Sequence, residues 1–301
     1  MSWKLSALAS KAQVDAALDR RDESIGWDEN IVLTAYEVDP KEPDVWRLEA
    51  YTQGKPTEAE RKALHQLFDE PVPPILAEKL PDTDWVSESQ KGVEPIRAGR
   101  FRVRTPDHAA LGDPSLTEFV IPAAQAFGTG QHETTAGCLE MLHIMKAQGL
   151  LPGNVADIGT GTGLLAFAAM DLWPLALATA SDIDPVCGPA VVTNCELNHI
   201  PLGTDRGQLA MVIADGMDDP ALQARAPYDL LIANILASPL IDMAHDFAGA
   251  VSPRGSILLA GLLEKQEESV RAAYRRAGFR LHRRIVNGDW SILWLRHRFQ
   301  G

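Results

Sequence analysis

Two patterns of apolar and polar positions follow one another along the chain, and the change falls near residue 120. Before it, short stretches with the period of a strand are separated by stretches with the period of an amphipathic helix. After it, apolar runs of strand length alternate with helical patterns, which is typical of a parallel sheet covered by helices. We therefore expect an α/β protein with a smaller α+β module in front of it.

The first 80 residues predict the element order β-α-β-β-α, with which a ferredoxin-like module begins. Thr57 and Glu60 have the spacing of a capping box and start the second helix. This part has no glycine-rich loop or catalytic cluster, so it reads as a binding or packing module. The other predicted elements are strands over 3–8, 31–38 and 45–52, and a helix over 11–21.

Residues 81–115 are rich in proline and charge, which predicts a linker that carries one or two strands. The expected domains are therefore 1–80, the linker 81–115, and 116–301. The linker contains one basic cluster, which we interpret as a solvated strand edge or, alternatively, as a contact with an acidic group on a partner. The cluster consists of Arg97, Arg100, Arg102 and Arg104.

Composition places the chain among ordinary globular proteins, with 301 residues, 46% of them hydrophobic and 23% charged. The longest apolar stretch, 164–180, is interrupted by Asp171 and Pro174 and is shorter than the roughly 20 residues of a membrane span. Residues 1–11 lack the pattern of a secretory signal, and three cysteines suit a reducing compartment. We expect a cytoplasmic protein without a membrane span.

The formal net charge of −13 is unevenly distributed. Residues 271–301 hold eight arginines and the single acid Asp289, whereas the first 270 residues hold 20 basic and 40 acidic groups. A protein region this acidic repels nucleic-acid phosphates and attracts a basic partner. The alternative is that the acidic residues only keep the protein soluble. We therefore expect no direct contact with nucleic acid.

Residues 155–163 read as a buried strand that runs into a glycine-rich turn and then into an apolar helix. Such a turn lets a ligand approach backbone N–H groups, here at Gly159 and Gly161. The spacing Asp-x-Gly-x-Gly-x-Gly differs from that of dinucleotide sites. An acid at Asp157 suits a ligand that carries a positive charge, such as a sulfonium or an amino group.

Polar side chains follow the predicted strands at their carboxyl ends. Asp182, after the strand 177–181, has the position of an acid that binds a ribose diol, whereas Asp184 reads as a helix cap. Asp215, after the strand 208–213, is a candidate for an adenine amino group. Asn234, after the strand 228–233, either holds an amine by its hydrogens or merely closes a turn.

The segment from Asp157 to Gly163, together with Asp182, resembles the seven-stranded S-adenosylmethionine-dependent methyltransferases. The segment 126–135, Ala-Phe-Gly-Thr-Gly-Gln-His-Glu-Thr-Thr, narrows this resemblance. With Asn-Ile-Leu-Ala at 234–237 and Gly-Leu-Leu at 261–263, it is similar to the ribosomal protein L-eleven methyltransferase family (PrmA). The similarity covers residues 84–301 and includes Asp-Trp-Val at 84–86 and Pro-Ile-Arg-Ala-Gly-Arg at 95–100.

The resemblance implies a doubly wound, Rossmann-like seven-stranded sheet joined by a mobile linker to a ferredoxin-like substrate-recognition domain. It implies that Thr135, Gly159 and Asp182 bind S-adenosylmethionine and that Asn234 lies at the methyl-transfer site. Its members methylate lysine ε-amines and the N-terminal α-amine of a basic ribosomal protein. The full set of expected site residues is Thr135, Gly159, Gly161, Asp182, Asp215 and Asn234, in a monomer.

Three other functions remain open from the sequence: a methyltransferase of another protein, a nicotinamide-dependent oxidoreductase and a non-catalytic ribosome-binding protein. No metal is expected, because His132-Glu133 lacks the second histidine of His-Glu-x-x-His and the cysteines lack paired zinc spacing. The loop also reads Gln-His-Glu at 131–133 where the family often has Thr-His-Pro.

The C-terminal segment predicts a hairpin that is expected of this class of methyltransferase. Apolar positions alternate on both sides of Asn287-Gly288, which predicts the turn. We expect the arginines of this hairpin on the solvent-facing side of the sheet.

Overall fold

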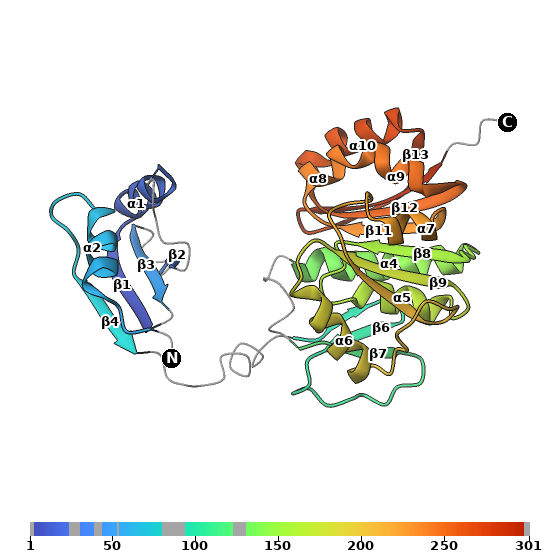
Figure 1. Cartoon of the computed structure of the whole chain (residues 1–301), viewed down its shortest axis with the longest axis horizontal. Helices are drawn as coiled ribbons and strands as arrows, with labels where there is room; N and C mark the ends of the chain where they lie inside the picture. Colours follow the sequence, from blue (N-terminus) through green and yellow to red (C-terminus); the bar gives the residue numbers. More distant parts are fainter. Residues whose placement is uncertain are drawn as a thin grey trace. The chain divides into compact units, whose positions relative to one another are not determined.

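The computed structural model describes residues 3–23, 31–38, 44–52, 54–79, 94–122 and 131–297 (Figure 1). The chain divides into two compact units, Met1–Trp85 and Val86–Gly301. Ala126 to Gly130 and Asp84 to Val86, which contribute to the family resemblance, lie outside the described residues. Within the described residues, no helix is long and apolar enough to cross a membrane.

Unit 1 has the ferredoxin-like order predicted from its sequence pattern, completed by a fourth strand. Its antiparallel sheet runs in the order β2-β3-β1-β4. The sequence pattern did not reveal β4, because Pro71, Pro73 and Pro74 in front of it read only as the end of a helix. The elements are β1 (Trp3–Ser10), α1 (Lys11–Glu23), β2 (Val32–Glu37), β3 (Val45–Thr52), α2 (Glu58–Gln66) and β4 (Ile75–Lys79).

The capping box at the start of α2 is confirmed. The Glu60 N–H donates to Thr57 Oγ1 at 3.2 Å, and the Thr57 N–H donates to Glu60 Oε2 at 2.6 Å. The helix then buries Leu64 against the apolar face of the sheet, where Leu5 and Leu48 are also fully buried. Local capping and the burial of this face fix the fold of unit 1.

Unit 2 is built on a sheet of seven described strands in the order β10-β9-β8-β11-β12-β14-β13. The pairs among the first five strands are parallel, and β14 pairs antiparallel with both of its neighbours. The chain order reverses between β8 and β11, and ligands bind at such a switch point in open α/β sheets. The strands are β8 (Asn154–Ile158), β9 (Leu177–Asp182), β10 (Leu209–Ile213), β11 (Tyr228–Asn234), β12 (Val251–Leu263), β13 (Phe279–Asn287) and β14 (Trp290–His297).

Helices cover both faces of this sheet, which explains why its strands read as nearly continuous apolar runs. One core contains residues of α4 (Gln131–Ala147), α5 (Leu164–Leu172) and α6 (Cys187–Leu197). The second core contains residues of α7–α10 on the opposite face. These helices are α7 (Pro220–Arg225), α8 (Ala237–Asp242), α9 (Ala244–Ala250) and α10 (Glu267–Arg276), the last preceded by the 3₁₀ helix η2 (Glu264–Gln266).

From residue 94 onward, the segment expected as a linker packs into unit 2 through a small three-stranded sheet. Its strands are β5 (Ile96–Ala98), β6 (Phe101–Arg104) and β7 (Thr117–Val120). The Phe101 and Phe119 rings stack with their centroids 5.9 Å apart, and Phe119 lies 6.2 Å from Phe167 of α5. This aromatic burial explains why the segment belongs to the core.

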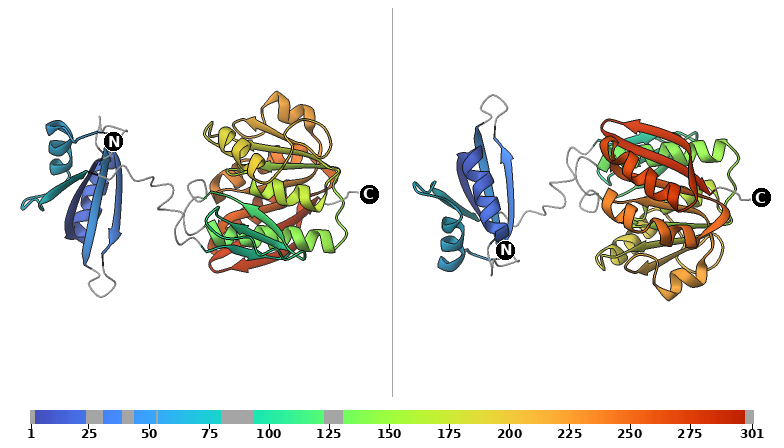
Figure 2. Two further views of the ribbon diagram at one scale, coloured as in Figure 1. Left: turned by 90° about the horizontal axis from the view of Figure 1, so that it is seen from below. Right: turned by 90° about the horizontal axis from the view of Figure 1, so that it is seen from above.

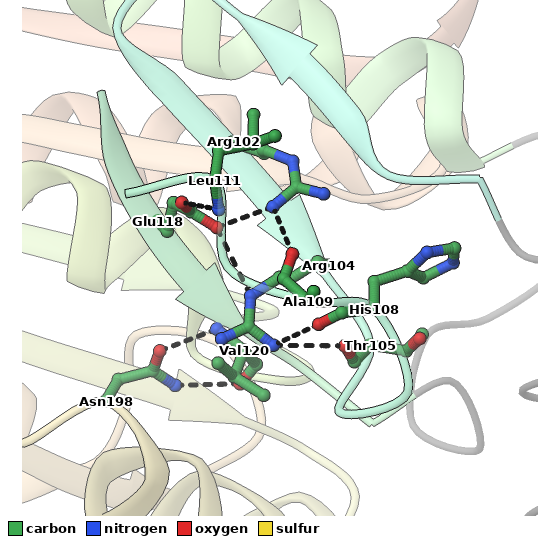
Figure 3. A network of polar contacts seen from close by, with 9 residues as sticks. All are labelled: Arg102, Arg104, Thr105, His108, Ala109, Leu111, Glu118, Val120 and Asn198. Carbon is green, nitrogen blue, oxygen red and sulfur yellow. Dashed lines mark hydrogen bonds and ion pairs between the residues drawn. The ribbon is translucent and has the colours of Figure 1, made fainter. Parts of the chain in front are cut away.

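Two arginines of this basic cluster, Arg102 and Arg104, bind an acid of the same chain, which corrects both interpretations for these two, whereas Arg97 and Arg100 are exposed. Arg102 Nη1 and Arg104 Nε donate to Glu118 Oε2 at 2.6 and 3.2 Å, and the Leu111 N–H donates to Glu118 Oε1 at 2.7 Å (Figure 3). Arg102 is buried rather than solvated. The carboxylate of Glu118 therefore ties β6 and the loop that follows it to β7.

Asn198, the residue after α6, forms hydrogen bonds with the backbone of β7 on the side away from β6. Its Oδ1 accepts the Val120 N–H at 2.7 Å, and its Nδ2 donates to the Val120 carbonyl at 2.8 Å (Figure 3). The amide thus replaces the neighbouring strand that the backbone of β7 lacks at this point. It joins the small sheet to the helix that follows Asp182.

The C-terminal hairpin of β13 and β14 forms one border of the large sheet (Figure 2). Asn287 pairs with Trp290, so the turn is Gly288-Asp289, one residue later than predicted. Arg280, Arg283 and Arg296 are exposed, as expected. Arg284 is exposed as well, and its guanidinium also binds Glu264 and the buried Glu267.

Candidate active site

The glycine-rich turn connects the end of β8 to the start of α5 and is closed by a buried acid. Asp157 Oδ2 accepts hydrogen bonds from Thr160 Oγ1 at 2.6 Å and from the Ala166 N–H at 3.1 Å. The backbone N–H groups of Gly159 and Thr160 donate to the Ser181 carbonyl at 2.8 and 2.9 Å. The turn is therefore fixed to both the strand before it and the neighbouring strand β9.

Asp157 is almost fully buried, and its other carboxylate oxygen, Oδ1, has no hydrogen-bond partner within the described residues. Burial raises the pKa of Asp157 to about 6. An unpartnered buried acceptor of this kind is costly, and a positively charged group of a ligand near the turn would offset that cost. The acid thus both closes the turn and gives the site negative character.

Asp182 is the last residue of β9 and lies directly beside the turn. Its Oδ2 accepts the Gly161 N–H at 2.8 Å, and its Oδ1 accepts the Asp184 N–H at 3.1 Å. A carboxylate has about four lone-pair positions, so about half of its capacity remains for a diol. Asp184 itself accepts the Val186 N–H at 2.9 Å, but the N-cap of α6 is Val186, so Asp184 stabilises the turn before the helix and is not its N-cap as predicted.

Asp215 lies one strand further out, just after β10. The Ala214 N–H donates to the carbonyl of Asp182 at 2.9 Å, which aligns the two strand ends. The Asp215 side chain is exposed. The structure thus places both acids at the same edge of the sheet, on adjacent strands.

Asn234 ends β11 on the other side of the turn, and the next residue is held by two glycines. A Cβ on Gly261, whose φ is +83°, would lie 2.3 Å from the Ile235 carbonyl oxygen. A Cβ on Gly159, whose φ is +72°, would lie 2.2 Å from Ile235 Cγ2. The glycine turn and β12 therefore both require glycine so that the segment after Asn234 can pack between them.

Thr135 is half-buried on α4, near the start of that helix. A short connection joins α4 to β8, so the helix runs antiparallel to the strand and begins at the strand's carboxyl edge. The hairpin turn also contacts this end, because Asn287 Nδ2 donates to the Glu133 carbonyl at 2.9 Å. Thr135, the glycine turn, Asp182, Asp215 and Asn234 thus all lie at one edge of the sheet.

Several apolar side chains that were not predicted as site residues also lie at this edge. Ile183 and Val186, next to Asp182, are 63% and 73% exposed, and Ile213 at the end of β10 is 42% exposed. Exposed apolar side chains beside Asp182, the acid expected to bind a ribose, suit the faces of a flat aromatic base. The signal in the sequence was an isoleucine directly after a strand-terminal acid. Among the described residues, no cluster of His, Cys, Asp or Glu has the arrangement of a metal site.

Comparisons with known proteins give one consistent result. The family model for ribosomal protein L11 methyltransferase (PrmA) matches residues 10–298. The protein named ribosomal protein L11 methyltransferase from Agrobacterium fabrum is 36% identical over 296 residues, which cover 97% of this chain and 98% of that protein. The protein of the same name from Rhizobium meliloti is 35% identical over 294 residues, with coverages of 97% and 98%.

A comparison with solved structures agrees with the sequence matches. The crystal structure of a ribosomal protein L11 methylase from Lactobacillus delbrueckii subsp. bulgaricus is similar with a TM-score of 0.57 and 25% identity. The match covers 68% of this chain and 99% of that chain.

The strand order, the glycine turn after the central strand and the acid on the adjacent strand define, with these matches, an S-adenosylmethionine-dependent methyltransferase. The match to the family extends over nearly the whole chain. The chain belongs to the ribosomal protein L11 methyltransferase family (PrmA). The nicotinamide-dependent alternative is therefore excluded.

Proposed function

We propose that this enzyme methylates amino groups of ribosomal protein L11, namely lysine ε-amines and the N-terminal α-amine. The single observation that carries this proposal is the match of a family model and of named relatives over nearly the full chain. The charge agrees with it, because the first 270 residues hold twice as many acidic as basic groups and so attract a basic protein.

The residues at the carboxyl edge fit the cofactor. The remaining lone pairs of Asp182 bind the ribose hydroxyls, and the turn from Gly159 to Gly161 gives the cofactor access to the backbone. Thr135 and the buried acid Asp157 lie toward its amino-acid end, and Asp215 lies toward the adenine amino group. When bound, S-adenosylmethionine supplies a methyl group on a sulfonium, which is a good leaving group.

Asn234 positions the amine that accepts the methyl group. Its side-chain oxygen and the neighbouring Ile235 carbonyl accept hydrogen bonds from the amine, which directs the nitrogen lone pair away from them. A free lysine has a pKa of about 10.4, so the amine must lose a proton before it reacts. Burial in the site lowers that pKa, and the two acceptors orient the neutral form.

Unit 1 is proposed as the substrate-recognition domain and unit 2 as the catalytic domain. The support is that unit 1 has a core of its own and that the expected site residues all belong to unit 2. We further propose that the enzyme acts as a monomer in the cytoplasm, where ribosomal proteins are made, and that it does not bind nucleic acid directly.

Two variants test the assignment of the site. Asp182→Ala should weaken the binding of S-adenosylhomocysteine at least tenfold, because hydrogen bonds to a charged group are worth about 1.5–3 kcal/mol each. Asn234→Ala should lower kcat about a hundredfold with little change in cofactor affinity, because the acceptor amine loses its orientation. Calorimetry and a labelled-methyl assay on purified ribosomal protein L11 measure these quantities.

Asp205→Ala is the matched control, since this exposed acid precedes β10 at the opposite edge of the sheet. It should behave as wild type in both assays. Wild-type methylation by both site variants would refute the assignment.

A further inference from the structure

Leu236 is an exposed apolar residue at the acceptor side of the site. It lies two residues after Asn234 and is 71% exposed, whereas the next apolar residues of the segment, Ala237 and Leu240, are buried. The other exposed aliphatic side chains named at this edge, Ile183, Val186 and Ile213, lie on the other side of β8, toward Asp182 and β10. Leu236 is therefore separate from the side chains suited to the cofactor base.

The fold does not explain a leucine at this position. Leu236 is the N-cap of α8, with φ −61° and ψ 154°, and its side chain makes no capping hydrogen bond. Leucine is among the poor N-cap residues, and serine or aspartate would satisfy a free N–H of the first turn. Residues that break a local rule without a stabilising gain tend to occur at functional sites.

The position of Leu236 relative to Asn234 is fixed by the packing around it. Ile235, between them, is held by the close approach of Gly261 to its carbonyl and of Gly159 to its side chain. Two residues span at most about 7 Å, so Leu236 lies within reach of a group that extends from an amine bound at Asn234. For a lysine, that group is its apolar four-carbon stem.

We propose that Leu236 packs against the methylene stem of the acceptor lysine and so determines specificity for ε-amines over the α-amine. This inference rests on the proposed function, because it takes Asn234 as the methyl-transfer site. An α-amine sits directly on the backbone and has no such stem. Each methylene that leaves water completely is worth about fourfold in affinity, so partial burial of two of them is worth about tenfold.

The experiment compares both kinds of amine on one substrate. Wild type, Leu236→Ala, Leu236→Ser and Leu236→Met are assayed on purified ribosomal protein L11, with site-resolved mass spectrometry of the methylated lysines and of the N-terminus. Leu236→Ala and Leu236→Ser should lower kcat/KM for the ε-amines about tenfold and for the α-amine less than twofold. Leu236→Met, which keeps the apolar volume, should restore lysine methylation.

Two controls separate this role from a structural one. The Tm of Leu236→Ser should not fall, because serine can cap α8, and its affinity for S-adenosylhomocysteine should equal that of wild type. Leu175→Ala removes an equally exposed leucine, 76% accessible and next to the start of β9 at the opposite edge, and should leave both rates unchanged.

The results separate a failure of the inference about Leu236 from a failure of the proposed function. If wild type methylates both kinds of amine and the Leu236 variants lose both equally, or lose neither, the inference about Leu236 is wrong and the proposed function stands. If wild type methylates neither amine of this protein, the proposed function fails and the inference fails with it.

Discussion

Replacing Gly261 by alanine tests how the segment after Asn234 is held. The new Cβ would lie 2.3 Å from the carbonyl oxygen of Ile235, 2.7 Å from its carbonyl carbon and 2.9 Å from its nitrogen. All three are backbone atoms, so no side-chain rotation relieves the contact. Since ordinary contacts begin at 3.4 Å, the segment must move by about 1 Å.

This displacement has two costs of different size. A left-handed backbone costs alanine roughly 1–2 kcal/mol, and overpacking costs about 1–3 kcal/mol, so stability should fall by about 2–5 kcal/mol. A misplacement of about 1 Å in the groups that orient a substrate lowers the rate about a hundredfold. Asp182 belongs to a different strand, so the affinity for the cofactor should change only a few-fold.

Gly278→Ala provides the matched control. Gly278 also has a positive φ, +96°, but its Cβ would lie 3.4 Å from the His297 ring, an ordinary contact. It carries the same kind of backbone strain at the joint between α10 and β13. Both variants should lose stability in urea unfolding, but only Gly261→Ala should lose kcat in a labelled-methyl assay at a temperature where both are folded. A wild-type kcat for Gly261→Ala, or an equal loss in both variants, would show that the Ile235 backbone does not position the acceptor.

Two further predictions concern pH and buried acids. Burial raises the pKa of Asp157 to about 6, from about 3.9 in an unfolded chain. The ligand-free protein should therefore lose about 2–3 kcal/mol of unfolding free energy as the pH rises from about 4 to about 6, because the folded protein then carries the buried charge. Asp157→Asn should remove this loss in urea unfolding, and a variant that keeps the wild-type slope would contradict the assignment. Burial raises the pKa of Glu267, but hydrogen bonds from Arg284 and Ser291 outweigh burial and hold it below its ordinary value, so its contribution is present near neutral pH and disappears as pH falls through the lowered pKa. Glu267→Gln should therefore cost about 1–3 kcal/mol at neutral pH, less than for a fully buried pair because Arg284 is 36% exposed, and an undiminished difference from wild type in acid would refute this.

The sequence pattern predicted the carboxyl ends of the strands that carry the candidate site residues to within about one residue. The strands that were expected to end at Ser181 and Ala233 include Asp182 and Asn234, because the neighbouring strands pair with these residues. Apolar runs locate a strand well, but its last residue depends on a partner that the local pattern does not contain.

Contacts between distant segments could not be predicted in the same way. Arg102 is buried because Glu118 accepts its hydrogen bond, and the pattern around Arg102 reads only as basic. The need for glycine at position 261 follows from the close Ile235 carbonyl, and Ile235 lies 26 positions earlier in the chain. The motifs therefore named candidate site residues, whereas the structure shows which contacts hold these residues in place.

The most direct test of the central claim is methyl transfer by the purified full chain from labelled S-adenosylmethionine to purified ribosomal protein L11, read out by site-resolved mass spectrometry. The account predicts methyl groups on lysine ε-amines and on the N-terminal α-amine, with transfer reduced about a hundredfold by Asn234→Ala. If no amine of this protein gains a methyl group from wild type, or if Asn234→Ala transfers at the wild-type rate, the account is contradicted.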